Sequence, residues 1–195
     1  LYNPSILLSF FLSVFSLFSF SDNQRIIDTL EIHNQIKSFG IDEDLLDFKS
    51  HFFSDLIFKN DSTIIYNPNG SLHLFEIHLG DIPKVSQISK TYHNGHNYNR
   101  YLFLHSNTIY SYGGQGLFNS FSGLIYFDHL SGEWLEKDIK FYPFDTRKVL
   151  NSWKIGNKIM VLLNHFQDSG NGYFSEDVKF SFGEIDLSTF EYVQY

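Results

Sequence analysis

The chain has 195 residues, which is enough for one domain with a sizeable hydrophobic core, and its formal net charge is −8 at pH 7. That charge and the lack of a Lys/Arg cluster argue against nucleic acid as a partner, because phosphate binding needs concentrated positive charge. The absence of cysteine excludes disulfides, a thiolate nucleophile and cysteine-based zinc sites. Aromatic residues make up 18% of the chain and alanine is missing, which favours strands over helices.

The first predicted element is a signal peptide over residues 1–21. Residues 6–20, "ILLSFFLSVFSLFSF", carry no charge and are shorter than the roughly 20 apolar residues of a bilayer span. Ser19 and Ser21 supply small residues before a cut at Asp22. A buried core segment and a retained membrane anchor remain alternatives, since no basic region precedes the apolar run. We expect an exported protein, periplasmic, outer-surface or secreted, with no membrane span in its mature segment.

Residues 22–55 form an N-terminal segment with one helical pattern. Leu45, Phe48, Phe52 and Leu56 recur at spacings of three and four, as on one face of a helix. The pattern predicts a short helix over residues 42–50, and a partial β-blade is the alternative for the segment.

From residue 56 onwards the chain repeats one plan. Ile65, Ile109 and Ile159 take equivalent places in three strand–turn–strand segments, "LIFKNDSTIIYNPNG", "LFLHSNTIYSYGG" and "WKIGNKIMVLLNH". A second hairpin repeats in step, in "FEIHLGDIPKV", "IYFDHLSGEWL" and "GEIDLSTFEYV". Four strands in a unit of roughly 45 to 58 residues fit the blades of a β-propeller.

The middle unit carries the most specific residues. Gly113 and Gly114 allow a strand to end in positive φ where neighbouring blades crowd together. Tyr126 and Trp134 supply large rings for the space between blades, and Asp128 supplies a carboxylate for backbone amides of the turn between them.

These residues resemble the kelch repeat. The matching positions are Arg100, His105, Ser106, Ile109 to Tyr112, Gly113, Gly114, Tyr126, Asp128 and Trp134. In the flanking units Asn69-Gly70 and Asn164-His165 stand at the glycine pair, and Val85 and Tyr192 stand near the tryptophan. The chain thus looks like a member of the galactose-oxidase-like kelch superfamily and is similar to exported kelch proteins of the Bacteroidetes type. The resemblance implies an all-β fold of kelch-type propeller blades, each a four-stranded antiparallel meander.

The predicted organisation is a degenerate blade at 56–100, a kelch-like blade at 101–148 and a degenerate blade at 149–195. Propellers of this family have about five to eight blades, and three wedge-shaped blades do not close a ring. We therefore expect an incomplete propeller that is a fragment of a longer protein, with self-association as the alternative.

Candidate binding residues lie in the longer connections. Aromatic rings in "QGLFNSFSG" suit stacking on a sugar or anchoring a protein partner, and polar side chains occur in "YHNGHNYNR" and in "NHFQDSGNGYFSED". The residues selected are Phe118, Phe121, His93, His96, Asp168 and Asn171. Packing onto the next blade and ordinary loop hydrogen bonds explain the same residues. Because no third metal ligand can be assigned and the spacing is not that of an EF-hand, we expect no metal and no cofactor.

The sequence shows no Ser/His/Asp order, paired carboxylates or phosphate-binding loop. We expect an exported, non-enzymatic interaction module that binds protein or glycan through its loops. A carbohydrate-active propeller enzyme, mutarotase-like or galactose-oxidase-like, is one alternative. The sensor portion of a longer membrane regulator is another.

Overall fold

The computed structural model describes residues 29–40, 55–68, 70–89, 98–115, 120–142, 147–165 and 179–195. In these residues one helix accompanies three four-stranded antiparallel sheets, none of them closed. Each sheet takes its four strands in chain order, so each is an up-and-down meander. The predicted all-β class is confirmed. Residues 1–28, which include the predicted signal peptide, and the predicted helix at 42–50 lie outside the described residues.

The helix and the three sheets follow one another along the chain. The helix is α2 (Thr29–Ser38), and the first sheet contains β1 (Asp55–Asn60), β2 (Thr63–Asn67), β3 (Phe75–His78) and β4 (Lys84–Gln87). The second sheet contains β5 (Tyr101–His105), β6 (Thr108–Tyr112), β7 (Leu124–Asp128) and β8 (Glu133–Lys137). The third sheet contains β9 (Arg147–Ile155), β10 (Lys158–His165), β11 (Lys179–Asp186) and β12 (Glu191–Gln194).

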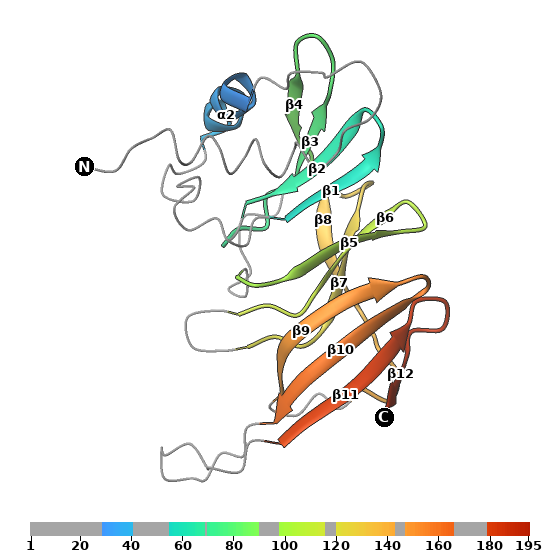
Figure 1. Ribbon diagram of the computed structural model, residues 1–195. Helices are drawn as coiled ribbons and strands as arrows, with labels where there is room; N and C mark the ends of the chain where they lie inside the picture. The colour runs from blue at the N-terminus through green and yellow to red at the C-terminus, as the bar shows by residue number, and fades with distance from the viewer. Residues whose placement is uncertain are drawn as a thin grey trace, which may run out of the picture.

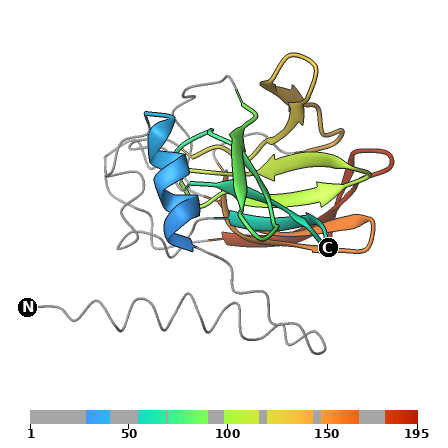
Figure 2. The ribbon, with the colours of Figure 1, turned by 90° about the horizontal axis from the view of Figure 1, so that it is seen from above.

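The sheets form a stack in chain order (Figure 1). β1 packs against β5 and β5 against β9, so the first strands of successive sheets lie next to one another. The view from above shows α2 beside β4, at the end of the stack formed by the first sheet (Figure 2). This arrangement of antiparallel sheets is propeller-like.

The first hairpin of every sheet has a two-residue turn, which fixes the register of the repeat. The residues paired across the turns are Asn60 with Thr63, His105 with Thr108, and Ile155 with Lys158. The second position of the following strand is therefore Ile64, Ile109 or Ile159. In the second hairpin turn Ser106 and Asn107 both have positive φ, 47° and 61°, as a twist-matched two-residue turn requires.

This register corrects one sequence equivalence. Ile64 packs in the cluster that contains Ile36 of α2, whereas Ile65 packs in the cluster with Leu102 of the second sheet. Because neighbouring strand residues point to opposite faces, the residue that matches Ile109 is Ile64, one position before Ile65.

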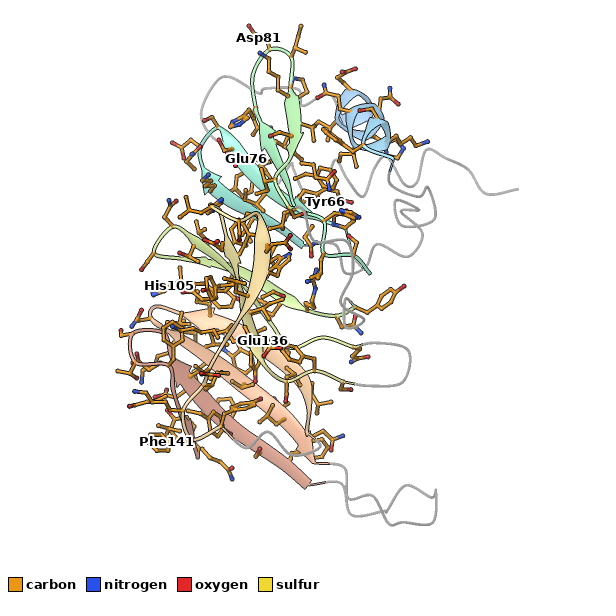
Figure 3. The ribbon with its side chains drawn as sticks, turned by 180° about the vertical axis from the view of Figure 1, so that it is seen from behind. Tyr66, Glu76, Asp81, His105, Glu136 and Phe141 are labelled. Atoms are coloured by element: carbon orange, nitrogen blue, oxygen red, sulfur yellow. The ribbon has the colours of Figure 1, made fainter. Side chains whose placement is uncertain are left out.

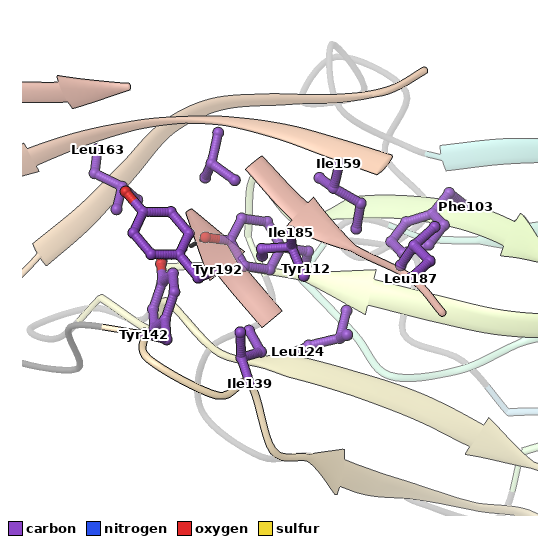
Figure 4. Close-up of a cluster of buried hydrophobic side chains, with 11 residues drawn as sticks. Phe103, Tyr112, Leu124, Ile139, Tyr142, Ile159, Leu163, Ile185, Leu187 and Tyr192 are labelled. Carbon is purple, nitrogen blue, oxygen red and sulfur yellow. Dashed lines mark hydrogen bonds between the residues drawn. The ribbon is translucent and has the colours of Figure 1, made fainter. Parts of the chain in front are cut away.

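Three apolar clusters fill the spaces between the layers. The cluster between α2 and the first sheet includes Tyr66, which lies towards the helix side of the sheet (Figure 3). The cluster between the first and second sheets includes Phe127, 1% exposed. The cluster between the second and third sheets is the most extensive of the three (Figure 4). The layers are thus held together face to face.

The helix α2 was not predicted from the sequence. Ile32 and Ile36 lie one turn apart and pack on the first sheet, and Glu31 and Lys37 suit the dipole at their ends of the helix. Gln35 Oε1 accepts a hydrogen bond from the Val85 backbone N–H at 2.8 Å. The helix therefore covers both an apolar face and part of the edge strand β4.

Candidate functional site

The meander topology sends the chain connections to two opposite edges of the stack. The two-residue turns β1–β2, β5–β6 and β9–β10 lie at one edge of the stack. The turns β3–β4, β7–β8 and β11–β12 lie at the same edge. We call the opposite edge the long-loop edge. Its described residues are 68, 70–74, 88–89, 98–100, 113–115 and 120–123. Binding and catalytic residues are frequent on loops that a rigid scaffold positions, so we expect a binding site at this edge.

Gly113 and Gly114 begin the connection from β6 to β7. Their φ angles are +71° and +136°, a backbone region that residues with side chains rarely adopt. The Gly113 N–H donates to the Gly123 carbonyl at 2.9 Å. A Cβ on Gly113 would lie 3.1 Å from Val149 Cγ2 of the third sheet. The glycine pair therefore stands where the backbone of one sheet approaches the next.

A group of five residues from three connections, which we call the loop platform, lies at this edge: Gly70, Tyr98, Gln115, Ser120 and Phe121. Tyr98 and Gln115 exchange two backbone hydrogen bonds, at 3.0 and 2.7 Å, and Gln115 also pairs with Ser120. The Tyr98 ring lies against Gly70, where an added Cβ would be 2.8 Å from Tyr98 Cε1. Tyr98 is nevertheless 45% exposed. The platform thus presents an aromatic ring on hydrogen-bonded backbone.

The structure places one of the predicted binding residues in this platform. Phe121 is half-buried, and its ring lies so close to Gly123 that an added Cβ would be 2.4 Å from Phe121 Cζ. The other predicted binding residues lie outside the described residues: Phe118, His93, His96, Asp168 and Asn171.

A buried polar group, the Arg100 clasp, joins the first and second sheets under this edge. Arg100 is 7% exposed, and its Nη2 donates to Asn67 Oδ1 and, at 2.6 Å, to the Ser71 carbonyl. Its guanidinium lies 5.8 Å from the centroid of the Trp134 ring, within the range of a cation–π contact. Trp134 Nε1 donates to the Leu72 carbonyl at 3.0 Å. Arg100, directly before the first strand of the second sheet, and Trp134, on its last strand, therefore both bind the loop that leads into β3.

His73 extends the buried polar group. Its Nδ1 lies 3.0 Å from Gln87 Nε2, which donates if the ring nitrogen is unprotonated. Desolvation by burial lowers the pKa of His73, so the neutral ring that accepts this bond is favoured. The arrangement is that of a satisfied structural histidine.

Tyrosines fill the corresponding place between the second and third sheets. The hydroxyls of Tyr112 and Tyr142 are 2.5 Å apart, and the Tyr142 ring meets the Tyr192 ring edge to face at 5.1 Å. All three rings are in the cluster of Figure 4. Burial, followed by the Tyr142 hydroxyl, raises the pKa of Tyr112 well above 10.0. Tyr112 therefore stays protonated, and the two rings are a packing element.

The remaining residues of the middle unit that were predicted to match a kelch repeat lie on β7 and β8. Trp134 packs on the first sheet, and Tyr126 lies on the opposite face of the second sheet, where its ring is 6.2 Å from Tyr110. Val85 and Tyr192 share with Trp134 the second position of a fourth strand, and each packs on the element before its sheet. The repeat therefore extends to the fourth strand of every sheet.

Asp128 and Asp186 occupy the same place, the last residue of a third strand. Asp128 Oδ2 accepts hydrogen bonds from Ser131 N–H at 3.0 Å and Ser131 Oγ at 2.6 Å. Asp186 Oδ1 accepts from the backbone N–H groups of Ser188 and Thr189, at 2.7 and 3.2 Å. These hydrogen bonds lower the pKa of both carboxyls below 3.8.

We expect Asp128→Ala to lower the melting temperature at pH 7, with a gap from wild type that closes at acidic pH. The folded-state pKa is below the unfolded one, so the stabilisation is present above about pH 4 and is lost as the pH falls further. Thermal melts from about pH 7 to about pH 3 measure the gap. Asp128→Asn keeps an acceptor oxygen without a titrating group, so it should lie closer to wild type at pH 7, and its gap should also change as the wild-type carboxylate is protonated. A constant gap for the alanine variant would rule out the ionised carboxylate as the source.

Within the described part of the chain, no group of three or more His, Asp or Glu side chains is placed to hold a metal ion. The helix in that part is too short and too polar to cross a membrane.

Sequence reasoning did not assign roles to three residues of this edge. Arg100 was noted as part of the repeat but not as a buried clasp, and Asn67 and Tyr98 were not singled out. The signal for Asn67 was a polar residue at the end of an apolar strand, directly before Pro68. Tyr98 has no such signal, because its partner Gly70 is distant in the sequence.

No protein-family model matches the chain, and no curated protein matches it either.

Proposed function

We propose that this chain is a segment of a kelch-type β-propeller that acts as a non-enzymatic interaction module and binds a protein or glycan partner at the long-loop edge. The observation that carries the proposal is the loop platform, where the exposed Tyr98 ring rests on Gly70 and the Tyr98 backbone is held by two hydrogen bonds to the Gln115 backbone. An exposed ring in a fixed position binds with little loss of conformational freedom.

The chemistry of the platform suits both partner classes. The face of a tyrosine ring stacks on the apolar face of a sugar or anchors a protein loop, and its hydroxyl remains available for a hydrogen bond. The side chains of Gln115 and Ser120 add an amide and a hydroxyl beside it. No charge on the platform demands a charged ligand.

The kelch assignment is supported by the residues at fixed places in the second sheet. Gly113 and Gly114 have positive φ at the end of β6, Asp128 accepts backbone hydrogen bonds after β7, and Trp134 packs between sheets from β8. The export assignment is supported by the apolar run at residues 6–20 and the small residues Ser19 and Ser21.

Replacing Tyr98 by alanine is expected to weaken partner binding at least about tenfold, because aromatic anchors at the centre of an interface contribute about 2 kcal/mol or more. For glycans, a panel of oligosaccharides is titrated into labelled protein and the amide shifts of residues 98–100 and 113–115 are followed by NMR. For proteins, a photo-crosslinking phenylalanine analogue is placed at position 98 in the native host. Leu130, 95% exposed in the β7–β8 turn at the opposite edge, is the control position for both tests.

A chemical-shift change at these amides supports the proposal, and so does a yield of crosslinked partner that is higher from position 98 than from the control position 130. No shift with any panel member together with no excess crosslink would refute it. Turnover of a sugar that falls in Tyr98→Ala would contradict the non-enzymatic assignment and favour a carbohydrate-active enzyme.

A further inference from the structure

A buried polar network joins two of the connections that form the loop platform. Gly70 belongs to the connection before β3, and Tyr98 belongs to the connection after β4. His73, 8% exposed, lies in the first of these connections, and Ser89, 5% exposed, lies in the second. Gln87, the last residue of β4, contacts both of them through its side chain. The network therefore helps to set how the two connections lie relative to each other.

The Gln87 side chain fixes the protonation state of His73. Its Nε2 lies 3.2 Å from the Ser89 carbonyl oxygen and 3.0 Å from His73 Nδ1. A carbonyl oxygen can only accept, so Gln87 Nε2 is a donor in this contact. His73 Nδ1 is then an unprotonated acceptor, and the neutral ring carries its proton on Nε2. Both contacts of Gln87 Nε2 therefore exist together only while His73 is neutral.

Backbone hydrogen bonds link the same residues. The Leu74 N–H donates to Ser89 Oγ at 2.8 Å, and the Leu74 carbonyl accepts from the Ile88 N–H at 2.9 Å. The His73 carbonyl accepts from Asn67 Nδ2 at 2.7 Å. A displacement of the His73 ring would therefore disturb the connection before β3 and the connection after β4 together.

A proton on His73 Nδ1 is incompatible with this arrangement. The ring N–H and Gln87 Nε2 would then be two donors facing each other. Rotating the amide would turn Oε1 towards the ring, but two acceptors would then meet at Gln87 and the Ser89 carbonyl. The charged ring would also be held in a site where water hardly reaches it. Protonation therefore favours a conformation in which the His73 ring leaves this site.

Burial is the cause of the lowered pKa of His73. The structure describes these titratable residues on the surrounding elements: Glu31, His33 and Lys37 on α2, Tyr66 on β2, Glu76 and His78 on β3, Lys84 on β4, and Tyr98 and Arg100 before β5. None of these contributes to the shift of the His73 pKa. An open conformation with a hydrated ring takes up the proton more readily than the closed one, because the closed one has the lower pKa. The closed conformation is thus fully favoured above about pH 6.5 and loses this advantage as the pH falls.

We propose that His73 is an acid-sensitive switch of the loop platform, and that its protonation separates the two connections and releases the Tyr98 ring from Gly70. The neutral form is the platform described above, and the protonated form no longer holds the ring in a fixed position. The consequence for a partner rests on the proposed function of the platform: the partner binds at neutral pH and is released at acidic pH.

An NMR titration of the full chain tests the switch without any partner. An added Cβ on Gly70 would lie 2.8 Å from Tyr98 Cε1, so a Gly70 Hα proton should show a ring-current shift and a nuclear Overhauser contact to that ring. The His73 ring should titrate below pH 6.5. Between about pH 7.5 and about pH 5, the Gly70 shift and the contact should be lost with the same midpoint.

Three variants separate a switch from a purely structural role. His73→Gln removes the titrating group and keeps an acceptor for Gln87, so the contact between Tyr98 and Gly70 should persist over the whole pH range. Gln87→Glu offers a carboxylate to the protonated ring, so it should raise the titration midpoint of His73. His129→Gln, at an exposed histidine of the β7–β8 turn on the opposite edge, is the matched control and should leave that midpoint unchanged.

A contact between Tyr98 and Gly70 that survives the titration of His73 would overturn the proposal. Loss of the contact with an unchanged midpoint in His73→Gln would overturn it too, and so would a Gln87→Glu variant that leaves the His73 midpoint in place. Loss of the strand signal in far-ultraviolet circular dichroism at the same pH would mean that the whole chain unfolds, which also contradicts a local switch.

These measurements contain no partner, so their failure would leave the crosslinking test at position 98 to decide the proposed function. Where that test succeeds, the switch makes a further prediction. The affinity of the partner should fall at least about tenfold between about pH 7 and about pH 5 in the wild-type chain, and should not do so in His73→Gln.

Discussion

Replacing Trp134 by alanine is expected to lower the free energy of unfolding by about 3 kcal/mol, and hence the melting temperature by about 6–12 °C. The ring fills space between the first and second sheets, its N–H donates to the Leu72 carbonyl, and Arg100 lies over its face. Truncation removes the packing and leaves the buried carbonyl and guanidinium without this partner. The half-buried position of the ring keeps the loss at the lower end of values for large aromatic residues.

Chemical denaturation of two further variants separates the contributions. Trp134→Phe keeps most of the packing but loses the N–H donor, so it should cost about 1 kcal/mol. Leu130→Ala, at a side chain that is 95% exposed, should leave stability unchanged. If Trp134→Ala left the free energy of unfolding as little changed as Leu130→Ala, that result would contradict the packing of the second sheet on the first through Trp134.

Replacing Gly113 by valine is expected to destabilise the chain by about 3 kcal/mol through two effects. A side chain at φ +71° costs about 1–2 kcal/mol, and more for a β-branched residue. The new Cβ would also lie 3.1 Å from Val149 Cγ2, and crowding of a packed interface costs about 1–3 kcal/mol. The substitution therefore tests the approach of the third sheet to the second.

Gly156→Val is the matched control for backbone strain. Gly156 has a similar φ of +58°, but nothing lies within 4 Å of an added Cβ. It should cost about 1–2 kcal/mol, from strain alone. Equal losses for the two variants, measured by denaturant unfolding, would mean that Val149 does not lie against Gly113.

Much of the strand pattern could be predicted from the sequence because it depends on local signals. Two-residue turns such as Ser106-Asn107 and alternating apolar residues mark the hairpins directly. The places of Val85, Trp134 and Tyr192 followed from aligning the second hairpins, and all three face the preceding layer in the structure. The equivalence of Ile65 was wrong by one residue, since sequence similarity does not show which face a strand residue occupies.

The features that sequence did not predict depend on contacts between distant segments. The helix α2 has a weak local pattern, and it is stabilised by Ile32 and Ile36 on the first sheet and by Gln35 on β4. The Arg100 clasp needs Asn67 and Ser71, some thirty positions earlier in the chain. The loop platform needs Gly70 to meet Tyr98. Only the folded arrangement of the sheets brings these groups together.

The loop platform depends on the packing of the second sheet on the first through Trp134, which brings the loops of the two sheets together. NMR of the two indole N–H groups tests it most directly. The Trp134 indole proton should show nuclear Overhauser contacts to Leu72 and should exchange slowly with water, because it is bonded to the Leu72 carbonyl. Rapid exchange of that proton, with no contact to residues 71–74, would contradict the stacking of the two sheets and the platform that depends on it.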